Sequence, residues 1–281
     1  MSSEMWPLIS ASLFVGLTVA FGPIVEAQDD ADMSGDSHFQ EELGINRFTT
    51  PSIEQLFDTL DSLKPIPVQE LTRPPQALRL DNRVKFALSF GVLIGDGFLA
   101  VEGEQIKAIE PLGRELLRRA KGLGVQQRVS RHSKQILDLA KRLDWSGLRK
   151  ELIVTQQDVE KAMLDLRDEE MVHLLSLGGW IRGLEIGAAS VAADFSPERA
   201  SQLRHLDLLD YYLQRLDTLS TPLKSTPLIS QIISGLKEVR QKLAGNAAIS
   251  QEDVSGIQMT ARSLVALIEG SPSTASAVGS N

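Results

Sequence analysis

Three charged residues lie inside apolar stretches of the sequence and are the first candidates for chemistry. Asp96 belongs to FGVLIGDGFLAVEG (residues 90–103), and Arg182 and Glu185 follow the apolar stretch LSLGGWI (residues 175–181). A charge inside an apolar helix is usually paired, because an unpaired buried charge costs several kcal/mol. We expect one of three arrangements: an Asp96–Arg182 salt bridge that fixes how two helices meet, a ligand pocket between the helices lined by Asp96, Arg182 and Glu185, or plain exposure at the helix edges.

A basic segment is the second candidate site. Residues 114–150 contain 11 Lys or Arg and 3 acidic residues, whereas residues 151–170 contain 7 acidic residues and 2 Lys or Arg. The densest part lacks aromatic side chains for base stacking, so nucleic acid is not expected. Either the neighbouring helices neutralise each other, or an acidic protein or anionic surface binds a set of exposed basic residues. That set comprises Arg114, Arg118, Arg119, Lys121, Arg128, Arg131 and Lys134.

Motifs for metals, cofactors and catalysis are scarce. Glu170 and His173 form one E-x-x-H pair, but a carboxylate-bridged di-iron bundle uses two such pairs, and no other histidine has a glutamate three residues before it. We therefore expect His173 to be structural. The chain has no cysteine, which excludes thiolate metal sites and cysteine nucleophiles. No metal site, cofactor or catalytic group is predicted, although triad members need not be close in sequence.

The elements that carry these residues are expected to be helices. Apolar residues, mostly Leu, Ala and Ile, recur at spacings of three and four, for example Leu203, Leu206, Leu209, Leu213 and Leu216. The fold class is therefore all-α, an irregular multi-helix bundle. Helices are expected from about residue 50, over 80–101, over 104–121 with a break or bend at Pro111, over 127–143, from a cap at Thr155, from Ser196 to about 219, and over 226–243 and 250–269.

The glycines of FGVLIGDGFLAVEG need a separate explanation. A phosphate loop would need GxGxxG or GxxxxGK[ST], and a membrane span would need a longer apolar run without Asp96. Gly91 and Gly95 are four residues apart, and Gly179, Gly183 and Gly187 repeat that spacing. Each glycine inside a helix costs roughly 1 kcal/mol relative to alanine. Their retention predicts two buried helices that cross at small-residue faces.

Two pairs of segments resemble each other within the chain. LSFGVLI (residues 88–94) aligns with LSLGGWI at an offset of 87, which also matches Asp81 with Asp168, and TQQDV (155–159) resembles SQEDV (250–254). Such offsets are what a duplicated helical unit would leave. Two unrelated glycine-bearing helices and ordinary helix-start chemistry would give the same similarity, so both explanations stay open.

The ends of the chain differ in composition from its body. Residues 1–27 have the order of a secretory signal peptide, with an apolar stretch, a Gly–Pro break and small residues before Ala27, although they lack Lys or Arg near the start. An uncleaved N-terminal anchor and a buried helix are the alternatives. Residues 28–48 form an expected acidic flexible linker that could fold back on the basic segment, 49–270 a helical domain and 271–281 a disordered tail.

The sequence favours an exported, non-catalytic helical interaction or scaffold protein, periplasmic or secreted, whose partner is an acidic protein or an anionic surface. If the signal is cleaved, no stable membrane span is expected; an uncleaved N-terminal helix would anchor the protein. The alternative function is an extracytoplasmic binder of a small molecule or anion, with its pocket between the glycine-bearing helices. An enzyme is the less favoured third class.

Overall fold

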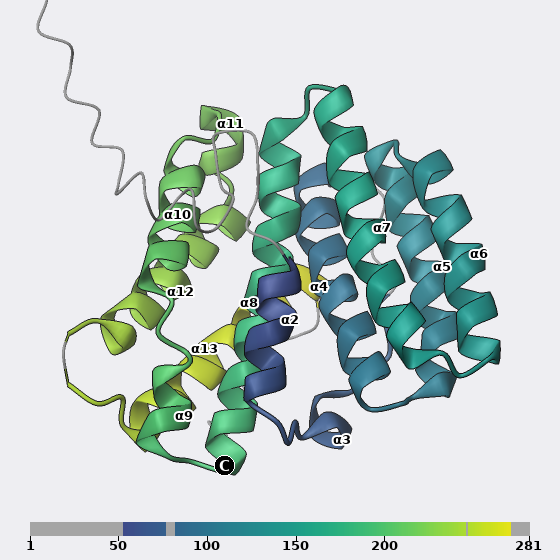
Figure 1. Ribbon diagram of the computed structural model, residues 1–281. Helices are drawn as coiled ribbons and strands as arrows, with labels where there is room; N and C mark the ends of the chain where they lie inside the picture. Colours follow the sequence, from purple (N-terminus) through teal and green to yellow (C-terminus); the bar gives the residue numbers. More distant parts are fainter. Residues whose placement is uncertain (1–52, 77–81, 246, 271–281) are drawn as a thin grey trace, which may run out of the picture. The chain divides into compact units, whose positions relative to one another are not determined.

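The structure is a computed structural model that describes residues 53–76, 82–245 and 247–270. These residues form helices joined by turns and loops, with no strand among them, as Figure 1 shows. The all-α prediction is therefore confirmed for the described part of the chain. The predicted signal peptide, the acidic linker, the helix start near residue 50 and the C-terminal tail lie outside the described residues.

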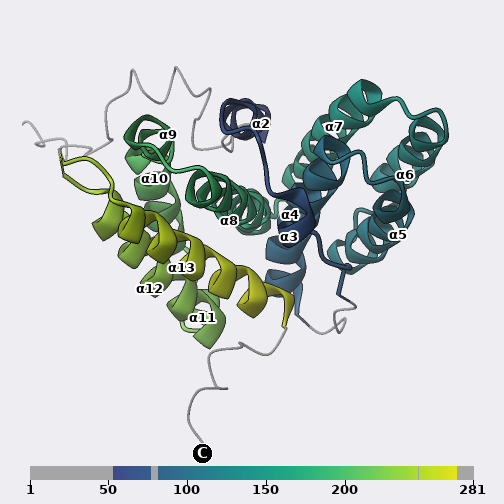
Figure 2. The same cartoon turned by 90° about the horizontal axis from the view of Figure 1, so that it is seen from below.

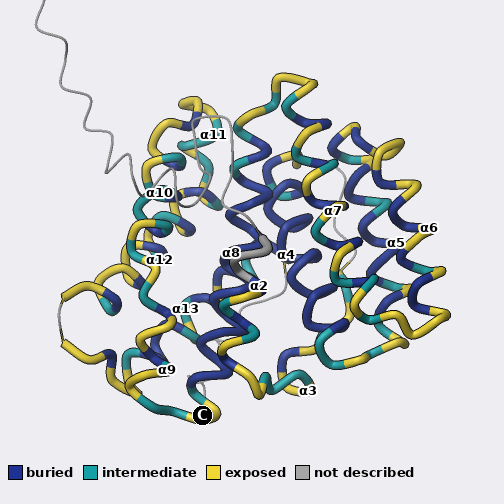
Figure 3. The backbone as a smooth tube through the Cα atoms, in the orientation of Figure 1, coloured by how far each residue is buried: buried dark blue, intermediate teal, exposed yellow. Residues whose placement is uncertain are grey.

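Two long apolar helices, α4 (Arg83–Glu102) and α8 (Glu169–Ala193), lie side by side at the centre (Figures 1 and 2). Nearly every residue of both helices is buried, which Figure 3 shows as continuous dark segments. A helix that is apolar on all sides requires neighbours on all sides. In the described ranges, α4 alone is long and apolar enough to cross a membrane, but 94% of its apolar window is buried inside the protein.

The other long helices form two groups, one with each of the two central helices. One group contains α4 with α5 (Ile106–Leu123), α6 (Gln126–Lys141) and α7 (Trp145–Asp165). The other contains α8 with α10 (Leu206–Asp217), α12 (Pro227–Leu243) and α13 (Gln251–Glu269). Figure 2 shows the two groups on opposite sides of the α4–α8 pair. Short helices connect or cover them: α2 (Ile53–Ser62), α3 (Val68–Leu71), α9 (Pro197–Ser201) and α11 (Thr221–Lys224).

The outer helices are amphipathic and begin at recognisable caps. In α12, the buried residues are Ile229, Ile232, Leu236, Val239 and Leu243, spaced three or four apart, so a single apolar stripe faces the core. Thr226 caps α12, and its side chain accepts a hydrogen bond from the backbone of Ile229. Ser250 and Asp253 form a reciprocal capping box at the start of α13. Both helices match the ranges expected from the sequence.

The helix over residues 106–123 continues through Pro111, so the expected break is absent, while a bend there stays a prediction. Two expected helix boundaries were wrong. Thr155 does not cap a helix; it lies inside α7, which begins after Asp144, and its hydroxyl donates to the carbonyl of Glu151 at 2.6 Å. The predicted helix from Ser196 to about residue 219 is two helices, α9 and α10, separated by a turn at residues 202–205.

Glycines allow α4 and α8 to touch through their backbones. A Cβ atom added to Gly91 would lie 2.5 Å from the backbone nitrogen of Gly179 and closer still to the carbonyl oxygen of Leu175. Reciprocally, a Cβ atom on Gly178 would lie 2.7 Å from the carbonyl carbon of Leu88 and closer still to its oxygen. The predicted small-residue crossing is thus present, and both helices run in the same direction through it.

The contacts at the crossing relate the two similar stretches to each other. Leu88 and Gly91 of α4 correspond to Leu175 and Gly178 of α8 at the offset of 87, and each glycine meets the leucine of the other helix. Gly187 does not belong to the crossing, because its nearest side chains come from leucines of α2, the following loop and residue 203. The duplication itself stays a prediction, since similar local packing is not evidence of common descent.

We predict that Gly91→Ala lowers the free energy of unfolding by about 3 kcal/mol, because the added methyl group would collide with backbone atoms that cannot rotate away. The matched control is Gly113→Ala in α5, where the nearest atom to an added Cβ is the Ser133 hydroxyl at 4.0 Å. The control is expected to be as stable as wild type or more stable. Urea unfolding of the three proteins measures the difference, and equal midpoints would contradict the backbone contact.

Candidate functional site

The structure brings Asp96, Arg182 and Glu185 together in one buried network. Nε of Arg182 donates to Oδ1 of Asp96 at 2.8 Å, and Nη1 of Arg182 donates to Oε2 of Glu185 at 2.6 Å. The residues are 7%, 1% and 4% exposed, respectively. Burial opposes the charged form of Arg182, but the two carboxylates outweigh it and raise the pKa of Arg182. The predicted salt bridge between α4 and α8 is therefore present.

Further groups complete the hydrogen bonding of this network. Nη2 of Arg182 donates to the carbonyl oxygen of Leu71 at 2.7 Å, so each guanidinium nitrogen has a protein partner. Oδ2 of Asp96 accepts from Nη2 of Arg73 at 3.2 Å, and Oε1 of Glu185 lies 3.6 Å from Nε of Arg262. The network therefore joins α4, α8, α13 and the chain around the end of α3. The charged groups of Asp96 and Arg182 are bound by other groups of the protein.

Arg119 is a correction to the predicted basic surface, because its side chain is 0% exposed. Its guanidinium binds both oxygens of Glu269 at 3.0 Å, Oε1 of Glu115 at 3.0 Å and the carbonyl oxygens of Ser89 and Gln76. The bidentate pair joins α5 to the last residue of α13. Burial raises the pKa of Glu269 more than Arg119 lowers it. Arg119 is thus a core residue.

The other predicted basic residues lie at or near the protein surface. Arg114 pairs with Glu110 one turn earlier, and Arg118 donates two hydrogen bonds to Glu115 at 2.8 and 2.7 Å. Those bonds, with Arg119, lower the pKa of Glu115 against the opposing effect of its burial. The remaining four, Lys121, Arg128, Arg131 and Lys134, are exposed.

Ion pairs between α6 and α7 neutralise part of the basic segment. Arg128 lies 3.4 Å from Asp165, and Arg131 lies 3.1 Å from Asp158. The buried ring of His132 lies between two carboxylates of α7, with Nδ1 at 2.7 Å from Glu151 and Nε2 at 2.9 Å from Asp158. Neutralisation between neighbouring helices therefore occurs on the side of α6 that faces α7.

The two members of the E-x-x-H pair bind different parts of the protein. Both carboxylate oxygens of Glu170 accept hydrogen bonds from Ser220, at the start of α11, while Nδ1 of His173 lies 3.0 Å from the Tyr211 hydroxyl on α10. Burial, with a smaller effect of Arg215, lowers the pKa of His173 to about 4, so the ring is neutral at pH 7. Among the described residues, no group of three or more His, Asp or Glu side chains is placed to hold a metal ion.

An ionic cluster that sequence reasoning missed lies beside an open cavity at the C-terminal end of α4. Arg149 of α7 contacts Asp61 at 2.6 Å and Glu102 at 3.3 Å, and Lys64 contacts the same two carboxylates at 3.0 and 2.6 Å. Burial alone would raise the pKa of Asp61, but hydrogen bonds from Lys64 and Arg149 lower it. The residues come from three distant parts of the chain, so no spacing pattern connects them.

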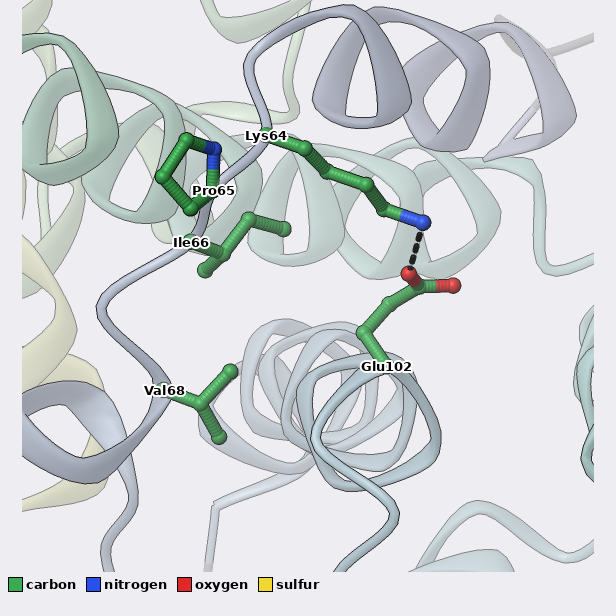
Figure 4. A pocket seen from close by; sticks show the side chains of 5 residues that line it. All are labelled: Lys64, Pro65, Ile66, Val68 and Glu102. Carbon is green, nitrogen blue, oxygen red and sulfur yellow. Dashed lines mark ion pairs between the residues drawn. The ribbon is translucent and has the colours of Figure 1, made fainter.

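The cavity has a volume of about 550 Å³ and is lined by Lys64, Pro65, Ile66, Val68 and Glu102. Figure 4 shows the Lys64 ammonium group pointing to the Glu102 carboxylate across the opening from the aliphatic side chains. The two charged groups that line the cavity already bind each other, so a ligand at either one would compete with or share this ion pair. The cavity is lined by none of the three residues predicted for ligand binding.

Comparison with family models, curated proteins and solved structures finds no match to this chain.

We predict that Arg182→Met lowers the free energy of unfolding by about 3–5 kcal/mol, because it leaves Asp96 and Glu185 buried without their main cation. The control is Arg262→Met, which removes an exposed cation 3.6 Å from Glu185 and is expected to cost less than about 1 kcal/mol. Chemical denaturation measures both. Wild-type stability of Arg182→Met would show that the network does not hold α4 and α8 together.

Proposed function

We propose that the protein is an exported, non-catalytic helical interaction module that binds an acidic partner through basic residues of α5 and α6. We define this α5–α6 basic surface by the five exposed members of the predicted set, Arg114, Lys121, Arg128, Arg131 and Lys134. Arg119 is excluded because it is buried, and Arg118 because it is half-buried against Glu115.

The observation that carries the proposal is that the buried arginines are paired with carboxylates, whereas two lysines of the α5–α6 basic surface pair with no carboxylate of the described residues. In the core, Arg182 and Arg119 each bind two carboxylates. On the basic surface, Lys121 and Lys134 are exposed and form no ion pair with another described residue. Exposed charge of one sign raises the association rate and specificity for a partner of opposite sign. The surface therefore suits an acidic protein.

The buried charged groups also support the role as an interaction module, because they bind each other. The ion pairs Arg119–Glu269 and Asp96–Arg182 each join two different helices, as expected of groups that set helix register. The alternative function, a small-molecule or anion binder, requires Asp96, Arg182 and Glu185 to face a pocket. Their mutual hydrogen bonds and exposures of 7% or less favour the interaction module.

We predict that Arg114→Ala/Lys121→Ala/Lys134→Ala weakens binding of polyglutamate about tenfold, since three attractions of about 0.5 kcal/mol each are lost. The control, Lys161→Ala/Lys237→Ala/Arg262→Ala, removes the same charge from exposed positions on α7, α12 and α13. It is expected to weaken binding less than twofold. Fluorescence anisotropy with labelled polyglutamate at low salt measures affinity, and thermal unfolding checks folding.

Two outcomes would contradict this proposal. An equal loss of affinity in both triple variants would mean that net charge alone attracts the peptide, without a particular surface. Failure of the folded wild-type protein to bind polyglutamate at low salt would mean that the α5–α6 basic surface does not bind acidic chains.

Export makes a separate prediction that concerns residues 1–27. The mature protein recovered from periplasmic or secreted material is expected to begin at Gln28, because small residues precede that bond. Mass spectrometry of the intact chain and its N-terminal peptide measures this. Ala27→Phe, which puts a bulky side chain before the bond, is expected to retain the leader, and a wild-type chain that still carries Met1 would refute cleavage.

A further inference from the structure

We infer that the partner presents an α-helix whose acidic residues recur every seven positions, and that this helix lies lengthwise along the outer face of the α5–α6 pair. This inference rests on the proposed function and specifies the partner's shape. It follows from the spacing of the exposed cations, from the register of α5 and α6, and from two half-buried leucines between the cations.

The exposed cations of α5 are spaced by seven residues. Lys107, Arg114 and Lys121 are all exposed. Seven residues make nearly two turns of an α-helix, so these side chains share one face and follow each other at intervals of about 10.5 Å. They form a straight row along the helix, which is different from a cluster around one point.

A second row runs along α6 beside the first. Lys134 and Lys141 are also seven residues apart and exposed. Helices α5 and α6 are joined by a short turn at residues 124–125, and the Ser133 hydroxyl donates to the carbonyl of Gly113 at 3.2 Å. Because α6 runs antiparallel to α5, this bond places Lys134 within one turn of Arg114 along the helix axes, so the two rows lie alongside each other.

The same surface pattern occurs on both helices. RELLRRAK (114–121) and KQILDLAK (134–141) each carry a cation, a leucine three residues later and a lysine seven residues later. Leu117 and Leu137 are both half-buried, one turn from a cation on either side. Each helix thus offers an apolar side chain between two positive charges, in antiparallel orientation.

An acidic helix fits this arrangement better than other polyanions. Acidic residues at seven-residue spacing on a partner helix recur at the same interval of about 10.5 Å, whereas alternate side chains of an extended strand recur at about 6.8 Å and DNA phosphates at about 3.4 Å per strand. An apolar residue between the partner's acids would cover Leu117 and Leu137, as in helix-in-groove recognition. Of these polyanions, only a helix places acids about 10.5 Å apart with an apolar residue between them on one face.

Two acidic residues on the same helices reduce the charge available to this partner. Glu110 forms an ion pair with Arg114, and Asp138 lies 3.6 Å from Lys141. Lys107, Lys121 and Lys134 have no such neighbour among the ion pairs of the described residues. We therefore assign the main electrostatic attraction to these three lysines. Leu117 and Leu137 would give the preference for a helical partner over other acidic chains.

The test uses two synthetic peptides of identical composition. One places Glu at every seventh position with Leu three residues later, and the other permutes the same residues so that Glu and Leu no longer share a face. We expect wild-type protein to bind the first peptide at least tenfold more tightly, measured by fluorescence anisotropy, with circular dichroism recording helix formation on binding. Equal affinity for both peptides, with polyglutamate also bound, would overturn the helix inference and leave the proposed function standing.

Variants of the two leucines separate the apolar contribution to binding from the electrostatic one. Leu117→Ser/Leu137→Ser is expected to weaken binding of the ordered peptide about tenfold and binding of polyglutamate less than twofold; Val154→Ser, at an exposed position of α7, is the control. If the double variant does not fold, the comparison of the two peptides on wild-type protein still decides. Binding of neither peptide and no polyglutamate would refute the proposed function, and preferential binding of anionic vesicles would overturn the inference in favour of a lipid surface.

Discussion

Backbone contact between two α-helices is possible only where neither helix has a side chain in the way, and α4 and α8 meet that condition at Gly91, Gly178 and Gly179. Both helices are buried around their circumference, and α5, α7 and α13 pack directly against one or both of them. The crossing also brings Asp96 and Arg182 within hydrogen-bond distance one turn further along. Once water is excluded there, each charge requires the other, and the ion pair in turn opposes sliding of one helix along its neighbour.

The two buried arginines have the same kinds of partner, which offset the cost of burying a positive charge. Arg182 and Arg119 each bind two carboxylates and at least one backbone carbonyl, so that all three guanidinium nitrogens are used. Their carbonyl partners include Leu71, the last residue of α3, and Gln76, five residues later. The two buried arginines thereby hold this short stretch of chain against the core at two points.

Sequence patterns anticipated the features that depend on one helix at a time. Glycine spacing indicated the crossing, and a charge in an apolar run indicated the Asp96–Arg182 pair, because both signals are local. Arg119 was misassigned because its neighbours are basic, although Leu116 and Leu123 place it on the apolar stripe of α5. The cluster of Lys64, Glu102 and Arg149 could not be anticipated, since its members meet only after three separate elements have packed.

The ion pair between Arg119 and Glu269 also orders events during synthesis of the chain. The two residues are 150 positions apart, and Glu269 is the last residue of α13. N-terminal parts of a chain begin to fold while the rest is still being made. Arg119 of the α4–α7 group therefore lacks its bidentate partner until α13, 150 residues further along the chain, has been made. Full pairing of Arg119 thus depends on a contact between distant parts of the chain, which couples the packing of α5 to the presence of α13.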